Sequence, residues 1–349
     1  MHFIPHCRTS DEVPVQGGYM MTSPFTGGTC TLMNEVREVT FRKEKFEYVA
    51  QFWICDDTGE EFTTTEQDGA SIAQVYNQYR EKYGIPYTDE IIGIRQQYGL
   101  SCAAMSEILG FGQNQWRLYE QGEVPNVSNG RMIRSIMNPD VMLDFIENSK
   151  NFLTEQEMKR VREKVSSSRK SPKDIELDRY ESQRIFSHSR GIENGFAPES
   201  LERLKNILLF ILDHCGEVWC TKMNKILFYI DFSAYKGWGM AMTGLTYRAI
   251  GYGPVPERWD RVFSEFDAIK QIPAAVGEYE GIVLSGTDKP NLKAFEDKEI
   301  ALMKRVCDEL KGMSARAISE LSHKEDAWID CQKSHDLIPF SKAFSLRAL

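Results

Sequence analysis

The spacing of apolar residues changes near residue 62, and this change limits the folds open to the chain. Before it, apolar residues occupy every second position of one stretch: Phe46, Tyr48, Ala50, Phe52 and Ile54. This is the period of a half-buried strand, and residues 32–41 are its expected hairpin partner, turning through residues 42–45. From residue 72 onward the apolar spacing is helical. The sequence therefore predicts a mainly α protein with a small N-terminal β module.

The chain has 349 residues, which is too many for one ordinary hydrophobic core. A basic, serine-rich stretch at residues 166–173 shows no periodicity and indicates a linker. The expected parts are a poorly ordered leader (1–20), the β module (21–70), a connecting helix with a helix-turn-helix domain (71–165), the linker (166–197) and a separate all-helical domain (198–349).

Composition limits the compartment and the class of protein. Hydrophobic residues make up 42% and charged residues 27% of the chain, as in ordinary globular proteins. The sequence contains neither an apolar run long enough to cross a bilayer nor a signal-peptide pattern. The eight cysteines are scattered without CxxC spacing, which is typical of free thiols in a reducing compartment. We expect a cytoplasmic protein with no membrane partner.

Two short predicted helices, residues 101–109 and 113–121, flank the turn at residues 110–112, which reads Gly-Phe-Gly. Two short helices around a glycine turn have the layout of a helix-turn-helix. The second helix begins with the candidate DNA-binding residues Gln113, Asn114, Gln115 and Arg117, whose side chains suit base edges in the major groove. Their expected core is Ala103, Met105, Ile108, Leu109, Trp116 and Tyr119. The alternative is a helical hairpin with a polar face that binds no DNA.

The charge of this region predicts weak DNA binding by a single copy. The whole chain carries a net charge of −9. Residues 88–138 hold four basic side chains (Arg95, Arg117, Arg131, Arg134) against five acidic ones (Asp89, Glu90, Glu107, Glu120, Glu123). Phosphate contacts dominate DNA affinity, so binding would need a dimer or help from the basic segment 159–173.

Residues 22–148 resemble the MqsA-type antitoxins, and residues 110–122 (GFGQNQWRLYEQG) carry most of the resemblance. The resemblance implies a zinc-knuckle β module, a connecting helix and a helix-turn-helix dimer that binds an operator. Asn114 falls where the family places a base-contacting asparagine. The family's second base-reading residue, an arginine before Tyr-Glu, is Leu118 here, with Arg117 one position earlier.

The zinc-knuckle positions depart from the family pattern. Its first Cys-Pro-x-Cys-Gly is residues 23–27, SPFTG, and its second Cys-x-x-Cys-Gly is residues 55–59, CDDTG. Ser23, Thr26 and Thr58 thus replace three of four thiolates, and Cys30 is not at a ligand position. Structural zinc needs four ligands, usually thiolate or imidazole. We expect a zinc-free relic of the site and no cofactor.

Residues 199–349 resemble the SocA-like Panacea domain through three spaced motifs. They are residues 221–231 (TKMNKILFYID), the aromatic glycine-proline turn of residues 247–257, and residues 321–328 (LSHKEDAW). The resemblance implies a helical domain that neutralises a toxin by direct binding.

The glycines and prolines of residues 251–256 predict a rigid turn that presents neighbouring aromatic side chains. Aromatic residues on a preordered backbone are enriched at binding hot spots. The expected partner-binding residues are Tyr252, Pro254, Val255 and Trp259. The alternative is that the aromatic residues belong to the core of the domain itself.

Catalysis has little support in the sequence. The suggestive neighbours are His214 beside Cys215, and His323 near Glu325. The chain contains no nucleophile elbow, P-loop or HExxH pattern. The sequence therefore predicts a binding protein and not an enzyme.

The favoured hypothesis is the antitoxin of a type II toxin-antitoxin system. Its C-terminal domain would bind a cognate toxin, and its helix-turn-helix, as a homodimer, would bind operator DNA in its own promoter. One alternative is a transcriptional regulator with a partner-sensing helical domain. Another is an adaptor that delivers a client to a protease or chaperone.

Overall fold

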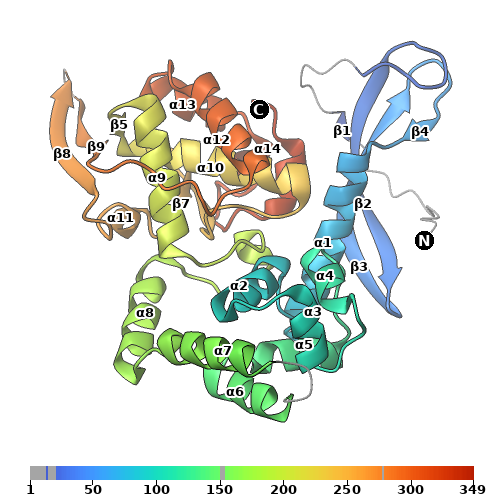
Figure 1. The fold of residues 1–349 in the computed structure, drawn as a ribbon. Helices are drawn as coiled ribbons and strands as arrows, with labels where there is room; N and C mark the ends of the chain where they lie inside the picture. Colours follow the sequence, from blue (N-terminus) through green and yellow to red (C-terminus); the bar gives the residue numbers. More distant parts are fainter. Residues whose placement is uncertain (1–12, 15–20, 150–153, 277–278) are drawn as a thin grey trace. The chain divides into compact units, whose positions relative to one another are not determined.

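The computed structural model describes residues 13–14, 21–149, 154–276 and 279–349 (Figure 1). These residues are mainly helical with a small N-terminal sheet, as predicted. The chain divides into two compact units, Met1–Val75 with Tyr180–Leu349 and, separately, Tyr76–Arg179. Of the predicted leader 1–20, only Val13–Pro14 lie within the described residues, so the expected disorder of the rest is not addressed.

The N-terminal sheet has the strand order β1-β2-β3-β4. Its strands are β1 (Val13–Pro14), β2 (Cys30–Phe41), β3 (Glu44–Cys55) and β4 (Glu61–Phe62). The predicted hairpin is confirmed as β2–β3, but it turns through only Arg42 and Lys43, which have φ values of 50° and 73°. Positive φ at both central residues is the geometry of a tight type I′ turn, which matches strand twist.

The β module belongs to the same compact unit as residues 180–349. The Asn34 side chain on β2 donates a hydrogen bond to the Phe344 carbonyl at 2.6 Å and accepts one from Gln51 at 3.0 Å. The module is therefore hydrogen-bonded to the C-terminal part of the chain.

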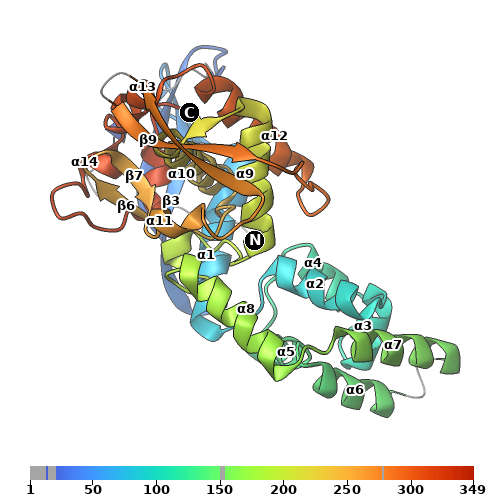
Figure 2. The same ribbon diagram turned by 90° about the vertical axis from the view of Figure 1, so that its left-hand side faces the viewer.

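Helix α1 (Thr65–Tyr83) follows β4, and six short helices follow it: α2 (Thr88–Tyr98), α3 (Cys102–Ile108), α4 (Gln115–Glu120), α5 (Val127–Ser135), α6 (Pro139–Asn148) and α7 (Glu155–Ser168). Their shared core includes Ile91, Tyr98, Met105, Trp116 and Ile146. Helices α6 and α7 lie side by side (Figure 2). The short helices predicted at residues 101–109 and 113–121 are present as α3 and α4, each one or two residues shorter at its ends.

The segment predicted as an unpatterned linker, residues 166–197, is helical over much of its length. It holds the end of α7, helix α8 (Pro172–Ile185) and the 3-10 turn η1 (Ile192–Asn194). Ser171 and Asp174 exchange hydrogen bonds between side chain and backbone at the start of α8. This reciprocal cap satisfies the N–H groups of Ser171 and Asp174, and Pro172 at the first helical position has no N–H to satisfy.

The C-terminal helices are α9 (Leu201–Cys215), α10 (Cys220–Trp238), α11 (Trp259–Val262), α12 (Asp297–Leu310), α13 (Ala315–Ser322), α14 (Asp326–Ile329) and the 3-10 helix η2 (Phe340–Ser345). Helix α10 is buried along almost its whole length, and α12, α13 and η2 pack around it. Most of its buried side chains are apolar, and the charged Lys225 and Asp231 are buried among them. Helix α10 is therefore the centre of this region.

The prediction of an all-helical C-terminal domain is wrong. Strands β5 (Val218–Trp219), β8 (Ile269–Val276) and β9 (Tyr279–Gly286) form a sheet of order β5-β9-β8, and β6 (Tyr247–Ile250) pairs with β7 (Gly253–Pro256). The strand signal is weak because Ile272 and Ile282 are exposed on the β8–β9 hairpin, so apolar residues do not gather on one face. Pro273 lies within β8 and weakens the strand signal in the sequence. The fold tolerates this proline because β8 is at the edge of its sheet.

Candidate partner-binding site and predicted DNA-binding helices

The predicted partner-binding turn is the tip of the β6–β7 hairpin. Tyr252 lies at the tip with 72% of its surface exposed, and Trp259 begins α11 with 46% exposed. Pro254 and Val255 are buried in β7. The structure thus places two of the four predicted residues on the surface and two in the interior.

Two side chains from distant motifs hold the hairpin backbone at its tip. The Lys225 amine on α10 donates to the Pro254 carbonyl at 2.8 Å, and the Trp328 indole on α14 donates to the Ile250 carbonyl at 2.8 Å. Lys225 is fully buried, and this burial lowers the pKa of its amine to about 7. Each strand end next to Tyr252 is therefore fixed by a directional bond.

Glycine is required at position 253. Its φ is 101°, a region that side chains rarely adopt. A Cβ built there would lie 2.5 Å from the Ser322 hydroxyl oxygen and 2.7 Å from Cε of Lys225. Gly253 thus lets α10 and α13 approach the hairpin closely.

A buried carboxylate holds the other end of the hairpin. Asp231 on α10 is fully buried and accepts hydrogen bonds from the backbone N–H groups of Met242 (2.7 Å) and Thr243 (2.8 Å). It also accepts bonds from the hydroxyls of Tyr247 (2.6 Å) and Thr243. Burial raises the pKa of Asp231, although these hydrogen bonds act in the opposite direction. Tyr247, the first residue of β6, is thereby tied to α10.

The third motif contributes a second buried carboxylate. Glu325 accepts hydrogen bonds from the Tyr229 hydroxyl at 3.1 Å and from the backbone N–H groups of Arg347 and Ala348 at 2.9 and 3.2 Å. Burial raises the pKa of Glu325. His323, next to it, stacks on Trp328 with ring centroids 4.1 Å apart. The three sequence motifs therefore meet around the hairpin and the C-terminal tail.

An ion-pair cluster lies beside the exposed aromatic residues. Arg248 on β6 pairs with Glu257 after β7 at 2.6 Å, and the His188 ring lies 3.2 Å from the same carboxylate. Burial would raise the pKa of Glu257, but the bonds from Arg248 and other donors outweigh it and lower the pKa. Arg258, one residue further, donates to the Ser187 hydroxyl at 3.1 Å. These contacts hold the chain between Val255 and Trp259.

Sequence reasoning gave these anchoring residues no role. Lys225 and Asp231 flank the apolar run of residues 226–230, and charged residues are almost never fully buried unless they are paired. These two charged residues beside an apolar run were the feature of the sequence that could have indicated buried hydrogen-bond anchors. The buried partners came from other parts of the chain, so the spacing along α10 gave no indication of them.

The predicted DNA-binding residues surround the start of α4. Gln113, Asn114 and Arg117 are exposed, whereas Gln115 is half-buried and donates to Glu123 at 3.2 Å. The predicted core beneath them is present except for Ala103, which is exposed. Ala103 faces outward because its neighbours Cys102 and Ala104 are the side chains of this turn that pack against the core.

Polar contacts fix α4 against its neighbours. The Ser106 hydroxyl of α3 accepts a hydrogen bond from the Trp116 backbone N–H at 3.1 Å, and the Trp116 indole donates to Glu120 at 2.7 Å. Arg95 on α2 donates to the Glu120 carboxylate at 2.5 and 3.0 Å. The positive charge of Arg95 thus partly neutralises the Glu120 carboxylate, so Glu120 repels a DNA phosphate near α4 less strongly.

The two knuckle sequences form matching turns. The Gly27 N–H donates to the Ser23 carbonyl at 2.9 Å, and the Gly59 N–H donates to the Cys55 carbonyl at 2.8 Å. Ser23 donates its hydroxyl proton to the Cys55 sulfur at 3.0 Å, and the Thr26 hydroxyl lies 3.6 Å from the same sulfur. The turns therefore converge on Cys55 through hydroxyl groups.

This donor set does not fit structural zinc, which takes four ligands, mostly thiolate or imidazole. One thiol and its hydroxyl neighbours occupy the positions that the resemblance assigns to four thiolates. Within the described ranges, no three His, Cys, Asp or Glu side chains are grouped so as to hold a metal ion. The cysteines that the structure describes are all free thiols.

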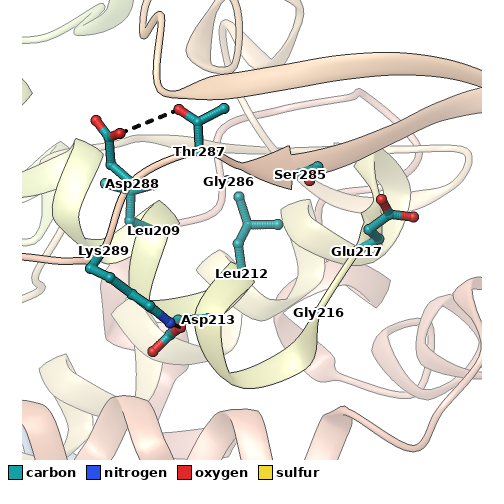
Figure 3. A pocket seen from close by; sticks show the side chains of 10 residues that line it. All are labelled: Leu209, Leu212, Asp213, Gly216, Glu217, Ser285, Gly286, Thr287, Asp288 and Lys289. Carbon is teal, nitrogen blue, oxygen red and sulfur yellow. Dashed lines mark hydrogen bonds and ion pairs between the residues drawn. The ribbon is translucent and has the colours of Figure 1, made fainter.

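A pocket of about 270 Å³ lies between the end of α9 and the end of β9 (Figure 3). Leu209 and Leu212 form its apolar wall, and Lys289 pairs with Asp213 at its rim. Its lining contains none of the residues predicted for a site. The pocket is therefore separate from the hairpin tip.

Comparison with known proteins identifies one part of the chain. The model of a family described as "Antitoxin SocA-like, Panacea domain" matches residues 223–329. No curated protein and no solved structure matches the chain. Among the helices that the structure describes, none is long and apolar enough to cross a bilayer. The match supports the SocA-like resemblance of the C-terminal part and suggests an antitoxin role.

Proposed function

We propose that this chain is an antitoxin that neutralises a cognate toxin by direct binding through residues 198–349. The observation that carries the proposal is the antitoxin-domain match at residues 223–329. The matched range contains the β6–β7 hairpin, Trp259, and the anchors Lys225 and Trp328.

The toxin-binding surface that we propose centres on Tyr252 and Trp259. Both are exposed, and the backbone on each side of Tyr252 is fixed by a hydrogen bond, one from the buried Lys225 and one from the half-buried Trp328. A preordered aromatic side chain loses little conformational entropy on binding. Pro254 and Val255 support the surface from inside β7, without contacting the toxin.

The test uses the full-length chain and the product of the adjacent reading frame. That product is expected to arrest growth when expressed alone, and co-expression of this chain is expected to restore growth. The two proteins should also elute together as a stoichiometric complex. Rescue without a complex would contradict neutralisation by direct binding.

The same experiment separates the alternatives. A transcriptional regulator with a partner-sensing domain would change promoter output without restoring growth. A protease or chaperone adaptor would restore growth only while its client is degraded or refolded. Toxin levels that stay constant during rescue would therefore favour neutralisation by binding.

For the same antitoxin we propose repression of its own promoter through α3 and α4, acting as a homodimer on operator DNA. The observation that favours this is the exposure of Gln113, Asn114 and Arg117 around the start of α4. Gel shifts with the intact chain and its promoter at low salt are the test. If they detect no binding, the repressor part of the proposal is wrong while the toxin-binding part stands.

A further inference from the structure

Cys30 and Cys55 are direct cross-strand neighbours. They are register partners in the antiparallel β2–β3 pair. The next register pair, Thr29 and Asp56, is joined by a hydrogen bond from the Asp56 N–H to the Thr29 carbonyl at 3.1 Å. The Cys55 N–H points to the other side, where it donates to the Glu60 carbonyl at 2.9 Å. Cys30 and Cys55 therefore form a non-hydrogen-bonded pair.

This kind of pair suits a disulfide. In non-hydrogen-bonded antiparallel pairs the Cα atoms lie about 4.5 Å apart, and both side chains project from the same face. Disulfides form between Cα atoms about 4.4–6.8 Å apart. The strands can accordingly accept a bond between Cys30 and Cys55 without a change of register.

The two thiols differ in access. The Cys55 side chain is fully buried, whereas Cys30 is half-buried. The Ser23 hydroxyl accepts the Phe25 and Thr26 backbone N–H groups at 3.2 and 3.3 Å, so its single proton is left for the Cys55 sulfur. A small reagent therefore reaches the Cys30 sulfur first. The Cys55 sulfur is enclosed and accepts a hydrogen bond from the Ser23 hydroxyl.

We propose that Cys30 and Cys55 form a redox-active dithiol that reduces small-molecule disulfides, with Cys30 as the entry thiol and Cys55 as the resolving thiol. The proposal is independent of toxin binding and of DNA binding. Its substrate class is a low-molecular-weight disulfide such as oxidised glutathione.

The reaction balances in two exchanges. The Cys30 sulfur, after losing its proton, attacks one sulfur of the glutathione disulfide, and the other sulfur leaves as a thiolate that takes up a proton. The Cys55 thiolate then attacks the Cys30 sulfur of the mixed disulfide, forming the Cys30–Cys55 bond and releasing the second glutathione. The chain is oxidised by two electrons, and one glutathione disulfide becomes two glutathione thiols.

The surroundings of the two sulfurs favour this order. Hydrogen bonds from the hydroxyls of Ser23 and Thr58 lower the pKa of Cys55 to about 6. Partial burial and the neighbouring Cys55 raise the pKa of Cys30. Thiolates are the attacking species, so the first exchange is slow and the second, which is intramolecular, is fast. The mixed disulfide should not accumulate in the wild-type chain.

The test treats the reduced full-length chain with oxidised glutathione and maps its thiols by mass spectrometry without reduction. Trypsin cuts between the two cysteines, at Arg37, Arg42, Lys43 and Lys45, so a disulfide appears as a cross-linked peptide. The wild-type chain is expected to lose two free thiols and to yield the Cys30–Cys55 peptide. Cys55→Ser is expected to retain one glutathione on Cys30.

Two further variants complete the experiment. Cys30→Ser changes the half-buried residue and should leave Cys55 unmodified, because its sulfur is enclosed. Cys102→Ser removes a half-buried thiol of α3 and should behave as wild type. The proposal is overturned if wild-type Cys30 retains glutathione as Cys55→Ser does. It is also overturned if Cys30 and Cys55 both stay reduced, whether or not other cysteines of the chain cross-link. Because mapping of the wild-type chain decides both outcomes, the test does not depend on how well Cys55→Ser folds.

Discussion

The β6–β7 hairpin and the α3–α4 helix pair both carry exposed side chains next to a sharp turn, but different forces hold them. The hairpin is fixed by hydrogen bonds with polar groups, which include the buried Lys225 and Asp231 and the half-buried Trp328 indole. The helix pair rests mainly on an apolar core that includes Met105 and Trp116. A hydrogen bond fixes the position of the backbone group that it contacts, whereas apolar side chains can shift slightly and remain packed. The comparison predicts that the two regions fail under different conditions.

The largest expected effect is on the helix pair. Trp116 is fully buried, and truncating a buried tryptophan costs roughly 3–5 kcal/mol. Trp116→Ala should lower the free energy of unfolding of the Tyr76–Arg179 unit by this amount in urea titrations followed by circular dichroism. The matched control is Leu118→Ala on the exposed face of α4, expected to cost less than about 0.5 kcal/mol. Equal losses for the two variants would mean that the apolar core does not hold α4.

The hairpin is expected to respond to pH where the helix pair does not. The pKa of the buried Lys225 amine is about 7, so this amine is unprotonated above pH 7 in the folded chain. In the unfolded chain the same amine stays protonated up to about pH 10.4. Stability should therefore rise with pH between these limits, by up to about 1.4 kcal/mol per pH unit. As pH falls through this window, that stability is lost.

The measurement compares denaturant unfolding of the wild-type chain and of Lys225→Met across pH 7–10. Methionine keeps the length of the side chain but cannot titrate, so the difference between the two chains isolates this amine from the cysteines and other titrating groups. The difference should change with pH. Parallel curves would place the Lys225 amine in contact with water and would remove it as a buried anchor.

Toxin affinity should depend on the exposed tip of the hairpin. Truncating an interface anchor typically costs about 2 kcal/mol or more, roughly thirtyfold in Kd. Tyr252→Ala and Trp259→Ala should each weaken toxin binding by about this factor in calorimetry, without lowering Tm. Tyr180→Ala is the matched control, because Tyr180 on α8 is an aromatic residue whose exposure lies between those of Tyr252 and Trp259. Unchanged affinity in the first two variants would move the toxin-binding surface elsewhere on the domain.

The same comparison explains how much of the molecule could be predicted from its sequence. The β2–β3 hairpin and the short helices were predicted because one face of each is apolar at a fixed period, as in Phe46, Ala50 and Phe52. The β8–β9 hairpin was missed because Ile272 and Ile282 are both exposed, so no single apolar face produces a pattern.

The sequence indicated the turn of the β6–β7 hairpin, including the buried Pro254 and Val255, but not the side chains that hold it. Tyr252 could be singled out because glycine and proline flank it, and such residues indicate a turn. Its anchors could not, because Lys225 reaches a carbonyl 29 positions away and the Trp328 indole reaches a carbonyl 78 positions away. Contacts of that range depend on how α10, α13 and α14 pack, which local spacing does not encode.

A smaller effect is expected for DNA binding by the helix pair. Asn114→Ala should weaken promoter binding toward the lower end of roughly 1–3 kcal/mol, the usual worth of a good base contact, because the exposed Leu118 further along α4 offers no polar group to a base. Arg117→Ala should relax base preference if Arg117 reads a base, or reduce the salt slope if it contacts a phosphate. Gel shifts at several salt concentrations measure both. Asn148→Ala, an exposed asparagine on α6, is the control, and losses equal to those of Asn114→Ala would contradict base contact by α4.

The smallest expected effect is that of metal removal. Ser23 and Thr26 surround Cys55 with hydroxyls, and even with its neighbour Cys30 the site offers two thiols where structural zinc needs four ligands. A chelator should therefore leave Tm unchanged, and elemental analysis of the purified chain should find no stoichiometric zinc. The matched gain-of-function variant is Ser23→Cys with Thr26→Cys and Thr58→Cys. Both turns already have the backbone hydrogen bonds from the Gly27 N–H to the Ser23 carbonyl and from the Gly59 N–H to the Cys55 carbonyl. This variant should therefore bind zinc, and a chelator should lower its Tm. One zinc per wild-type chain would contradict the prediction that these turns bind no metal.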